Sequence, residues 1–274
     1  MSLSSYFEKK IKKINRALEG YLPRKNDRPA SLHEAMRYAV LLGGKRIRPI
    51  LALAACEAVS GNPKEVMPAA CAIELIHSYS LIHDDLPCMD DDDTRRGKPS
   101  CHKKFGEATA LLTGDALLTL AFQILNTAGV KNQKRRFDTA RFIAEGIGSH
   151  GMIGGQAVDI ESKGKEIDLP TIDYINTQKS GVLIAVSLKA GAYLGGGNPS
   201  QVNALYRYGK VMGLLFQIVD DILDGEGYAK LVGVSEAQKK ARRLRDQAKG
   251  ALHGFGGRSQ ALERIADFFL TRTH

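Results

Sequence analysis

Two apolar helical stretches of this chain each end in a group of aspartates. The first group, residues 84–93, holds six carboxylates in ten residues, and the second is the stretch DDILD at residues 220–224. Like charges this close repel one another, so a fold gains nothing from gathering them without a counter-ion. An exposed acidic patch is the alternative, but the apolar helix before each group anchors its start against a core. The sequence therefore predicts two helix ends that attract cations.

Helical periodicity extends over most of the remaining chain. Ala, Leu, Lys, Glu and Arg are plentiful and Trp is absent, which favours helix. We find no alternating strand pattern of useful length and no shift in composition that marks a domain boundary. The chain is therefore predicted to be all-α, with a single domain over residues 1–274. The expected helices cover residues 3–20, 31–42, 49–60, 66–86, 107–128, 135–150, 151–161, 170–195, 200–224, 234–252 and 258–271.

Local signals place several of these helix ends. Ser31 and Glu34 have the spacing of a capping box, which predicts Ser31 as the N-cap of the second helix. The glycine pair at 43–44 ends that helix, and Pro49 opens the next one. The charged segment 91–106 is expected to be a loop.

The two aspartate groups have the ligand chemistry of a magnesium site. Carboxylate oxygens suit Mg²⁺, which bridges a few of them to substrate phosphates. Arg95 and Arg96 follow the first group at once and can grip phosphate oxygens in bidentate fashion. One DDxxD motif alone is weak evidence for a metal site, because exposed helix ends often carry such residues. Two groups at two apolar helix ends can face one another across a cavity and hold several metal ions, so we expect a site for phosphate-bearing molecules.

Basic and polar side chains elsewhere fit the same site. Lys45 and Arg48 follow a glycine turn and precede a helix, where backbone N–H groups favour anions; a helix cap with solvated charges is the alternative. His77 lies seven residues before Asp84 and hence near the same helix face, although a single helical His is more often structural. Lys179 lies in an otherwise apolar helical stretch, which favours an inward-facing phosphate ligand.

Composition narrows the classes of molecule that this chain is expected to bind. The net charge of +9 suits nucleic acid or small polyanions, but the basic residues lie beside glycines and aspartates, which favours small molecules and no nucleic acid. The four cysteines form no CxxC pair, which predicts free thiols in a reducing cytosol. The N-terminus has no apolar core like that of a signal peptide, and we expect no membrane span because no apolar run approaches ~20 residues.

The ordered motifs resemble a known family. In chain order they are GGKRIRP, HSYSLIHDDLPCMDDDDTRRGKPSCHKKFGEATALLTGDALL, GGQAVDI, QKSG and FQIVDDILD. They look like the trans-isoprenyl diphosphate synthases, with the bacterial farnesyl diphosphate synthases as the nearest match. The resemblance covers the chain from about residue 20 to its C-terminus. It implies an all-α bundle of about ten core helices around a deep central cavity, as a cytoplasmic homodimer.

The resemblance also implies an activity and its participants. An allylic diphosphate condenses with isopentenyl diphosphate, with the help of three Mg²⁺ ions for which Mn²⁺ can substitute. The implied catalytic residues are Asp84, Asp90, Arg95, Lys179 and Asp220. The implied Mg²⁺ ligands are Asp84, Asp90 and Asp220, supported by Asp85, Asp91 and Asp224. Arg95, Lys179, Ser180 and Gln217 would bind the allylic diphosphate, and Lys45, Arg48, His77 and Arg96 the isopentenyl diphosphate.

Product length is expected to depend on two residues before the first aspartate group. On a helix, Ser80 lies one turn below Asp84, and Tyr79 lies beside it in the path of a growing chain. In the family, an aromatic residue at the position of Tyr79 goes with short products. We therefore expect a C15 product, farnesyl diphosphate. The alternatives are a C20 product and a Tyr79 that merely packs in the core.

One segment departs from the family pattern. After Asp224 the family usually has roughly twenty more residues that carry a further diphosphate-binding lysine, and Lys230 is the one candidate to replace it. A partner-dependent or non-catalytic subunit is therefore one alternative, although both metal motifs are complete. A class I terpene cyclase is another, but its second motif normally mixes Asn, Ser or Thr with acidic residues. A nucleic-acid binder is a third, and no motif supports it.

Overall fold

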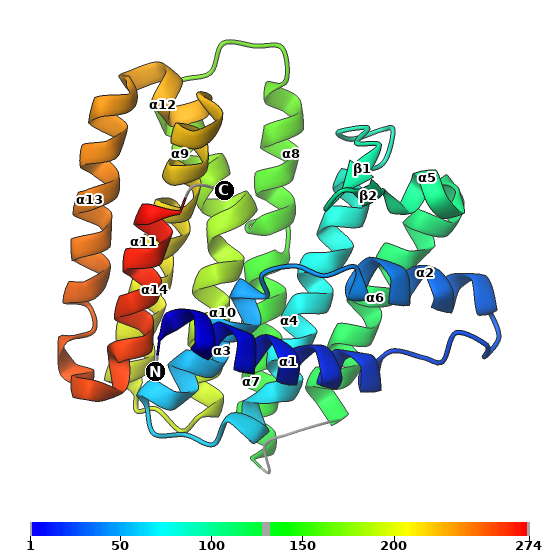
Figure 1. The fold of residues 1–274 in the computed structure, drawn as a ribbon, viewed down its shortest axis with the longest axis horizontal. Helices are drawn as coiled ribbons and strands as arrows, with labels where there is room; N and C mark the ends of the chain where they lie inside the picture. Colours follow the sequence, from blue (N-terminus) through cyan, green and yellow to red (C-terminus); the bar gives the residue numbers. More distant parts are fainter. Residues whose placement is uncertain (1, 128–131, 273–274) are drawn as a thin grey trace. The chain divides into compact units, whose positions relative to one another are not determined.

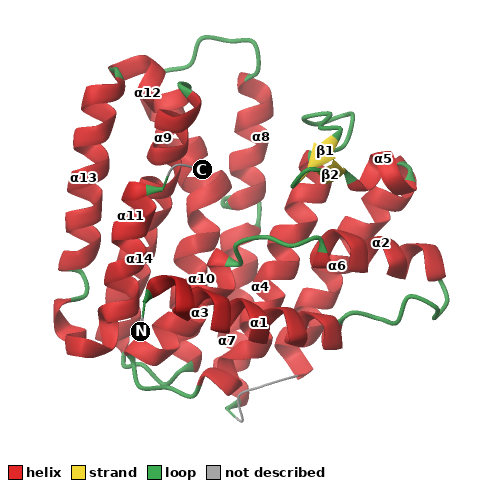
Figure 2. Cartoon of the chain, in the orientation of Figure 1, coloured by secondary structure: helices red, strands yellow, loops and turns green. Residues whose placement is uncertain are grey.

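The computed structural model of this protein describes residues 2–127 and 132–272 and is almost entirely helical (Figures 1 and 2). The prediction of an all-α chain is confirmed. Within the described residues, the strands form a single two-stranded hairpin. The predicted end of one helix at residue 128 lies outside the described residues.

The chain divides into two compact units. The first comprises residues 1–50 and 67–131, and the second comprises residues 51–66 and 132–274. The chain therefore passes between the units three times, within the helices α3 (Ile47–Ala58) and α4 (Pro63–Asp84) and between residues 131 and 132.

The first unit holds the N-terminal helices and the first aspartate group. Ser2 caps the first helix by accepting a hydrogen bond from Ser5 N at 3.2 Å, and Ile14 and Leu18 are fully buried. Besides parts of α3 and α4, the elements are α1 (Leu3–Tyr21), α2 (Ala30–Leu41), β1 (Thr94–Arg95), β2 (Lys98–Pro99), α5 (Cys101–Phe105) and α6 (Glu107–Thr127).

The second unit is built around α11 (Pro199–Asp224), which packs against α10 (Val182–Leu194) and α13 (Val234–Gly250). A full capping box, in which Asn198 and Gln201 bond reciprocally, starts α11. The fully buried Tyr208 donates its hydroxyl to Leu262 O at 2.7 Å. The other elements are α7 (Gln133–Ile147), α8 (Met152–Ser162), α9 (Leu169–Ile175), η1 (Asn176–Gly181), α12 (Gly227–Val232), η2 (His253–Ser259) and α14 (Gln260–Thr271).

Two predicted helix starts are wrong by one or two residues. Helix α2 begins at Ala30, and Pro29 occupies the N-cap with no side-chain hydrogen bond. Because Pro29 O accepts from His33 N at 3.2 Å, Ser31 lies inside the first turn and forms no capping box. Helix α3 begins at Ile47, so Pro49 lies within a first turn whose N–H groups need no helical partner.

The segment 91–106, predicted to be a loop, contains the hairpin and α5. Thr94 pairs with Pro99 and Arg95 with Lys98, so the turn consists of two residues. Both turn residues have positive φ, 55° at Arg96 and 72° at Gly97, as a type I′ turn requires. Two residues per strand are too few to produce a period-two pattern in the sequence.

The predicted helix over 170–195 is helical throughout but not uniform. Residues Asn176–Gly181 form a π-helical segment between α9 and α10. Wider π turns inside α-helices are frequent at functional sites. Helix α12 was not predicted, because six residues are too few to display helical periodicity.

Helix α6 meets the length and composition of a membrane-crossing helix, which differs from our expectation for this chain. Its window over residues 107–126 has a mean hydropathy of 1.5 and is 39% buried. Core helices of soluble proteins have the same properties, so this single helix is a weak indication of a membrane span. Its exposed face includes Leu111 and Leu112, which are 48% and 56% exposed.

Candidate active site

The first aspartate motif begins where α4 ends. Asp84 is the last helical residue, and the backbone then turns back so that Asp90 N donates to Asp84 O at 2.9 Å. Met89 N donates to Leu86 O at 2.8 Å within the same turn. The backbones of Asp84 and Asp90 are therefore adjacent, although five residues separate them. This turn brings together the two residues expected to be principal metal ligands in the first unit.

Arg95 neutralises two carboxylates of this motif. Its Nε lies 3.0 Å from Asp85 Oδ1, and its Nη2 bonds both Asp85 and, at 2.9 Å, Asp92 Oδ2. Burial raises the pKa of Asp85, which is 2% exposed, and the hydrogen bond from Arg95 works against that rise. The β1–β2 hairpin holds Arg95 in place. Asp92 was not among the predicted site residues.

The glycine turn before α3 lies against Arg96. Arg96 Nη1 donates to Gly43 O, and a Cβ on Gly44 would lie 2.6 Å from Arg96 Cζ. Gly44 also has a φ of 123°, so its backbone conformation favours glycine. The structure thus joins Arg96 to the glycine turn before Lys45 and Arg48, and the resemblance assigned these three residues to isopentenyl diphosphate.

Arg48 and His77 form a second contact in the same region. Arg48 Nη1 donates to His77 Nε2 at 3.2 Å. Burial lowers the pKa of His77 well below its usual value, and the positive charges of Arg48 and Arg96 lower it further. His77 is therefore a neutral imidazole that accepts from Arg48. This arrangement leaves the charge of the pair on the guanidinium.

Arg46, between the two predicted ligands Lys45 and Arg48, has a different role. It is 2% exposed and pairs with Glu74 Oε1 at 2.7 Å. It also donates to Asn15 Oδ1 at 2.9 Å and to a backbone carbonyl of α2. These bonds commit Arg46 to the fold, which agrees with its omission from the predicted ligands.

Tyr79 is buried on α4, five residues before Asp84. Its ring meets that of His83 edge to face, with centroids 5.7 Å apart. Burial and the charge of Asp84 raise the pKa of Tyr79 to about 12, so the phenol stays protonated. Its buried hydroxyl has no hydrogen-bond partner among the described residues. Ser80 donates to His77 O at 3.0 Å.

In the second unit, the π-helical segment positions two predicted ligands. Lys179 Nζ lies 2.6 Å from Asp159 Oδ2, and Gln217 Nε2 donates to Ser180 Oγ at 2.9 Å. A Cβ on Gly155 would strike the backbone of Lys179, so glycine there permits the close approach of α8. Lys179, Ser180 and Gln217 therefore lie close together.

The second aspartate group lies at the end of α11. Asp220 Oδ1 pairs with Arg272 Nη2 at 2.5 Å. Burial raises the pKa of Asp220, Arg272 opposes this effect, and the neighbouring charge of Asp224 adds to the rise. Asp221 accepts from Tyr228 N at 2.8 Å, which fastens the short segment after α11 to the aspartate group.

Sequence reasoning missed three polar partners in this unit. Asp159 is part of the GGQAVDI motif, and its spacing from the other motifs was the signal that could have identified it as a site residue. Asn176 donates to Asp221 at 3.4 Å, and it lies one turn before Lys179 in a stretch already singled out. Arg272 is 52 residues from Asp220, and no local pattern could have linked the two.

The donor sets of both aspartate groups fit Mg²⁺. Asp84 and Asp90 in the first unit, and Asp220 and Asp224 in the second, offer oxygen ligands only. The pKa of Asp220 is raised first by burial and then by the charge of Asp224, and Arg272 opposes both effects. A divalent cation is the natural counter-ion for such groups.

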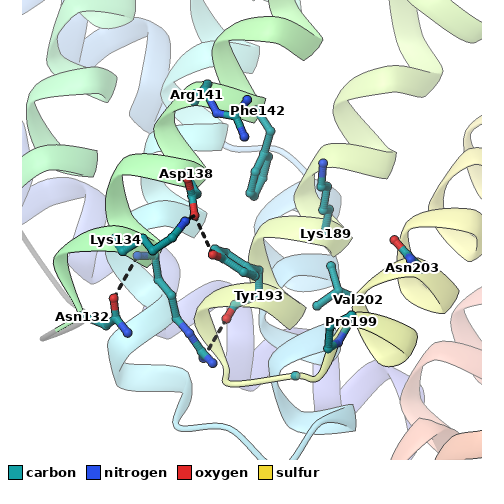
Figure 3. Close-up of a pocket in the computed structure, with 12 residues that line it drawn as sticks. Asn132, Lys134, Asp138, Arg141, Phe142, Lys189, Tyr193, Pro199, Val202 and Asn203 are labelled. Carbon is teal, nitrogen blue, oxygen red and sulfur yellow. Dashed lines mark hydrogen bonds and ion pairs between the residues drawn. The ribbon is translucent and has the colours of Figure 1, made fainter.

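Each unit also has a pocket. A small one in the first unit is lined by residues that include Asp85, Arg95 and Arg96. A larger one in the second unit, of about 480 Å³, lies between α7 and α10 and includes Lys189 and Tyr193 (Figure 3). None of the predicted site residues lines the larger pocket.

Helix-end carboxylate groups suit Mg²⁺, and the guanidinium and ammonium groups near them suit phosphate esters. The chain belongs to the polyprenyl synthetase family, which its residues 29–236 match. It is therefore a prenyltransferase of the isoprenyl diphosphate synthase type.

Individual relatives support this assignment. The chain is 42% identical to the heterodimeric geranylgeranyl pyrophosphate synthase large subunit 2 of Arabidopsis thaliana, over 97% of this chain and 76% of that protein. It is 43% identical to a chloroplastic geranylgeranyl pyrophosphate synthase of Capsicum annuum, over 97% and 78%. The apo structure of an FPP/GFPP synthase from Zymomonas mobilis superposes with a TM-score of 0.94 at 40% identity, over 98% and 99%. A geranyltransferase from Legionella pneumophila superposes with a TM-score of 0.92 at 32% identity, over 99% and 97%.

Proposed function

We propose that this chain is a farnesyl diphosphate synthase. It condenses isopentenyl diphosphate with dimethylallyl and then geranyl diphosphate, and it releases diphosphate at each step. The observation that carries the C15 product is Tyr79, a buried aromatic ring five residues before Asp84 on α4. A rigid aromatic ring on this helix limits the length to which an apolar product chain can grow.

Residues of the first unit bind isopentenyl diphosphate in this proposal. Arg48 is held by neutral His77, and Arg96 is held by the carbonyl of Gly43, so both guanidinium groups are positioned before substrate arrives. Lys45 is exposed at the same turn. Positioned guanidinium groups bind diphosphate oxygens with less loss of side-chain entropy than mobile ones.

Four residues are proposed to bind the allylic diphosphate, namely Arg95, Lys179, Gln217 and Ser180. Mg²⁺ bound by the aspartates would supply Lewis-acid stabilisation of the departing diphosphate. The allylic C–O bond breaks with its electron pair on the diphosphate, and the isopentenyl double bond forms the new C–C bond. The proton lost in that step goes to the released diphosphate, so no side-chain nucleophile is needed.

A C20 product is the alternative that the relatives favour. Both plant relatives named above are geranylgeranyl pyrophosphate synthases. The Zymomonas mobilis neighbour is an FPP/GFPP synthase, so similar folds make products of different length. We give Tyr79 more weight, because product length depends on side chains along the path of the growing chain and not on overall similarity.

A partner-dependent subunit is the second alternative, because one plant relative is a large subunit of a heterodimeric enzyme. The segment after Asp224 is short here, but it is folded: α12 follows directly, and Tyr228 N bonds Asp221. All acidic residues of both motifs are present. We therefore propose that the chain is active without a different partner, with Mg²⁺ or Mn²⁺, and that residues 1–274 act as one synthetase domain.

We also propose a homodimer that uses the exposed face of α6. Leu111 and Leu112 are exposed on a helix that is otherwise apolar. Burying such a stripe against a second copy removes apolar surface from water, at about 25 cal/mol per Å². A Leu112→Lys variant that stays dimeric by light scattering would argue against this interface.

The test of the activity is incorporation of radiolabelled isopentenyl diphosphate by the purified chain alone, with dimethylallyl diphosphate and Mg²⁺. The proposal predicts labelled prenyl diphosphate that appears only when both substrates are present. Turnover of the allylic substrate without isopentenyl diphosphate would indicate a cyclase. Incorporation that requires a second, different protein would indicate a dependent subunit.

A further inference from the structure

His102 is a buried histidine with one ring nitrogen left for a ligand. Its side chain is 3% exposed, and its Nδ1 bonds Ser100 Oγ at 3.1 Å. Its Nε2 is buried and has no hydrogen-bond partner among the described residues. A buried polar atom without a partner destabilises the fold, so its presence calls for an explanation.

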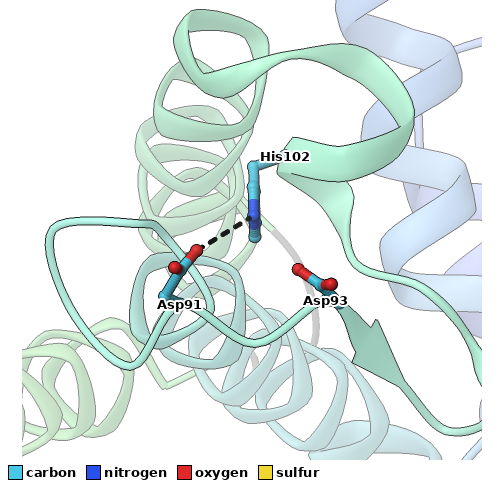
Figure 4. Close-up of side chains that lie close together, drawn as sticks. All are labelled: Asp91, Asp93 and His102. Atoms are coloured by element: carbon cyan, nitrogen blue, oxygen red, sulfur yellow. Dashed lines mark ion pairs between the residues drawn. The ribbon is translucent and has the colours of Figure 1, made fainter.

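Two carboxylates lie beside this nitrogen. Asp91 and Asp93 extend from the loop after α4 toward the His102 ring (Figure 4). Asp91 Oδ1 is 4.0 Å from Nε2, and the three candidate ligand atoms lie within 4.8 Å of one another. The 4.0 Å separation is too long for a hydrogen bond, so Asp91 does not satisfy the nitrogen.

Hydrogen bonds hold the backbone around these residues in place. Asp91 N donates to Leu86 O at 3.2 Å, and Ser100 N donates to Asp93 O at 2.9 Å. The second bond joins the two ends of the hairpin and brings α5, with His102, next to Asp93. The hairpin thereby brings together Asp91, Asp93 and His102, which lie within a stretch of twelve residues.

We propose that Asp91, Asp93 and His102 form a binding site for Zn²⁺ that shares only Asp91 with the carboxylates expected to bind Mg²⁺ with substrate. An imidazole nitrogen with carboxylate oxygens suits Zn²⁺, whereas Mg²⁺ prefers oxygen alone. The Nδ1 contact with Ser100 is the kind of support that orients metal-binding histidines. Ligand atoms around tetrahedral Zn²⁺ are roughly 3.3 Å apart. Asp91 and Asp93 are 61% and 73% exposed in their side chains and can turn inward to that spacing.

Lys103 competes with the ion. Its Nζ lies 2.7 Å from Asp93 Oδ1, on an exposed side chain. Zn²⁺ must displace this ammonium to use Asp93 as a ligand. Loss of Lys103 therefore strengthens the site, while loss of His102 weakens it. The two substitutions are adjacent in the sequence but change the affinity for Zn²⁺ in opposite directions. This difference distinguishes a metal site from a general effect on folding.

The experiment is a calorimetric titration of the full chain with Zn²⁺, in the presence of excess Mg²⁺ and without substrate. Co²⁺ serves as a parallel probe, because its visible absorption reports nitrogen ligation. The proposal predicts one Zn²⁺ site per chain that Mg²⁺ does not displace. Asp93→Asn and His102→Ala weaken it at least ~10-fold, Ser100→Ala weakens it by a smaller factor, and Lys103→Ala tightens it.

Two control variants keep the result interpretable. Cys88 is exposed and its free thiol could bind Zn²⁺, so Cys88→Ser must leave the site intact. His253→Ala removes an exposed histidine elsewhere and must do the same. Circular dichroism checks the fold of His102→Ala, and Asp93→Asn, at an exposed position, tests the site should that variant unfold. The proposal is overturned if no Zn²⁺ binds in excess Mg²⁺, or if Cys88→Ser abolishes binding while Asp93→Asn does not.

Discussion

Arg48 Nη1 lies 3.2 Å from His77 Nε2, and the histidine accepts this hydrogen bond as a neutral ring. Two residues 29 positions apart are thus joined at the turn that also holds Arg96 against Gly43. The neutral state of His77 has consequences that can be measured without any substrate.

The first prediction concerns the dependence of stability on pH. Burial and the neighbouring arginines lower the folded-state pKa of His77 well below 6.5. Below pH 6.5 the unfolded chain therefore binds a proton at His77 that the folded chain does not. Stability contributed by the neutral ring is present above pH 6.5 and is lost as pH falls from there toward the folded pKa. The loss is at most about 1.4 kcal/mol per pH unit.

Urea denaturation of the wild type and of His77→Gln between about pH 8 and about pH 5 measures this effect. The wild type should lose stability faster than the variant as pH falls below 6.5. His253→Gln, at an exposed position, is the matched control and should follow the wild type. Parallel curves for the wild type and His77→Gln would contradict the assignment.

The second prediction separates a structural arginine from its binding neighbours. The side chains of Arg46 and Glu74 are 0% and 2% exposed in their 2.7 Å ion pair. Arg46→Leu leaves a buried carboxylate unpaired and should cost about 3–5 kcal/mol in stability. The double variant Arg46→Leu/Glu74→Leu should recover much of this loss. Lys45→Ala, at an exposed position, should change stability by less than ~0.5 kcal/mol while raising the KM for isopentenyl diphosphate.

The third prediction is a change in product length. Tyr79→Ala removes a buried ring, so chains that stop at C15 should grow to C20 or beyond. Loss of a large buried side chain costs about 3–5 kcal/mol, so Tyr79→Leu provides a milder version. Chromatography of the dephosphorylated products measures the shift, and Ser80→Ala is the neighbouring control with a much smaller change in volume. Unchanged C15 product from both Tyr79 variants would show that this residue only packs in the core.

The fourth prediction concerns the contact between Arg272 and the second aspartate motif. Arg272 Nη2 lies 2.5 Å from Asp220 Oδ1, so a cation at Asp220 must compete with a guanidinium. Arg272→Ala should therefore lower the Mg²⁺ concentration needed for half-maximal activity, by roughly threefold to tenfold for a coupling of about 1 kcal/mol. Arg264→Ala, at an exposed position on α14, which ends just before Arg272, is the control. A higher Mg²⁺ requirement in Arg272→Ala would mean that this arginine supports the motif.

Most helices could be predicted from the sequence, because the apolar residues of α1 and α11 recur with helical spacing and α4 is a long apolar stretch. The short elements could not. The β1–β2 hairpin and α12 contain too few residues to display a period, and the start of α2 was misplaced because Pro29, not Ser31, occupies the N-cap.

The residues of the candidate site, like the helices, could be predicted from the sequence only in part. Motif residues such as Lys179, Ser180 and Gln217 were predicted and lie together. Arg272 was not predicted, because only a tertiary contact brings it to Asp220. The buried His102 was not predicted, because the hairpin that brings it to Asp91 and Asp93 was itself not predicted. Motifs identify residues by their local spacing, whereas partners from distant segments require the fold.

The most direct test of the proposed function is product analysis with three allylic substrates offered separately to the purified chain. Each of dimethylallyl, geranyl and farnesyl diphosphate is supplied with isopentenyl diphosphate and Mg²⁺. We predict that the first two are elongated to farnesyl diphosphate and that the third is not extended. Efficient conversion of farnesyl diphosphate to a C20 product would contradict the farnesyl assignment, and no product from any of the three would contradict the activity itself.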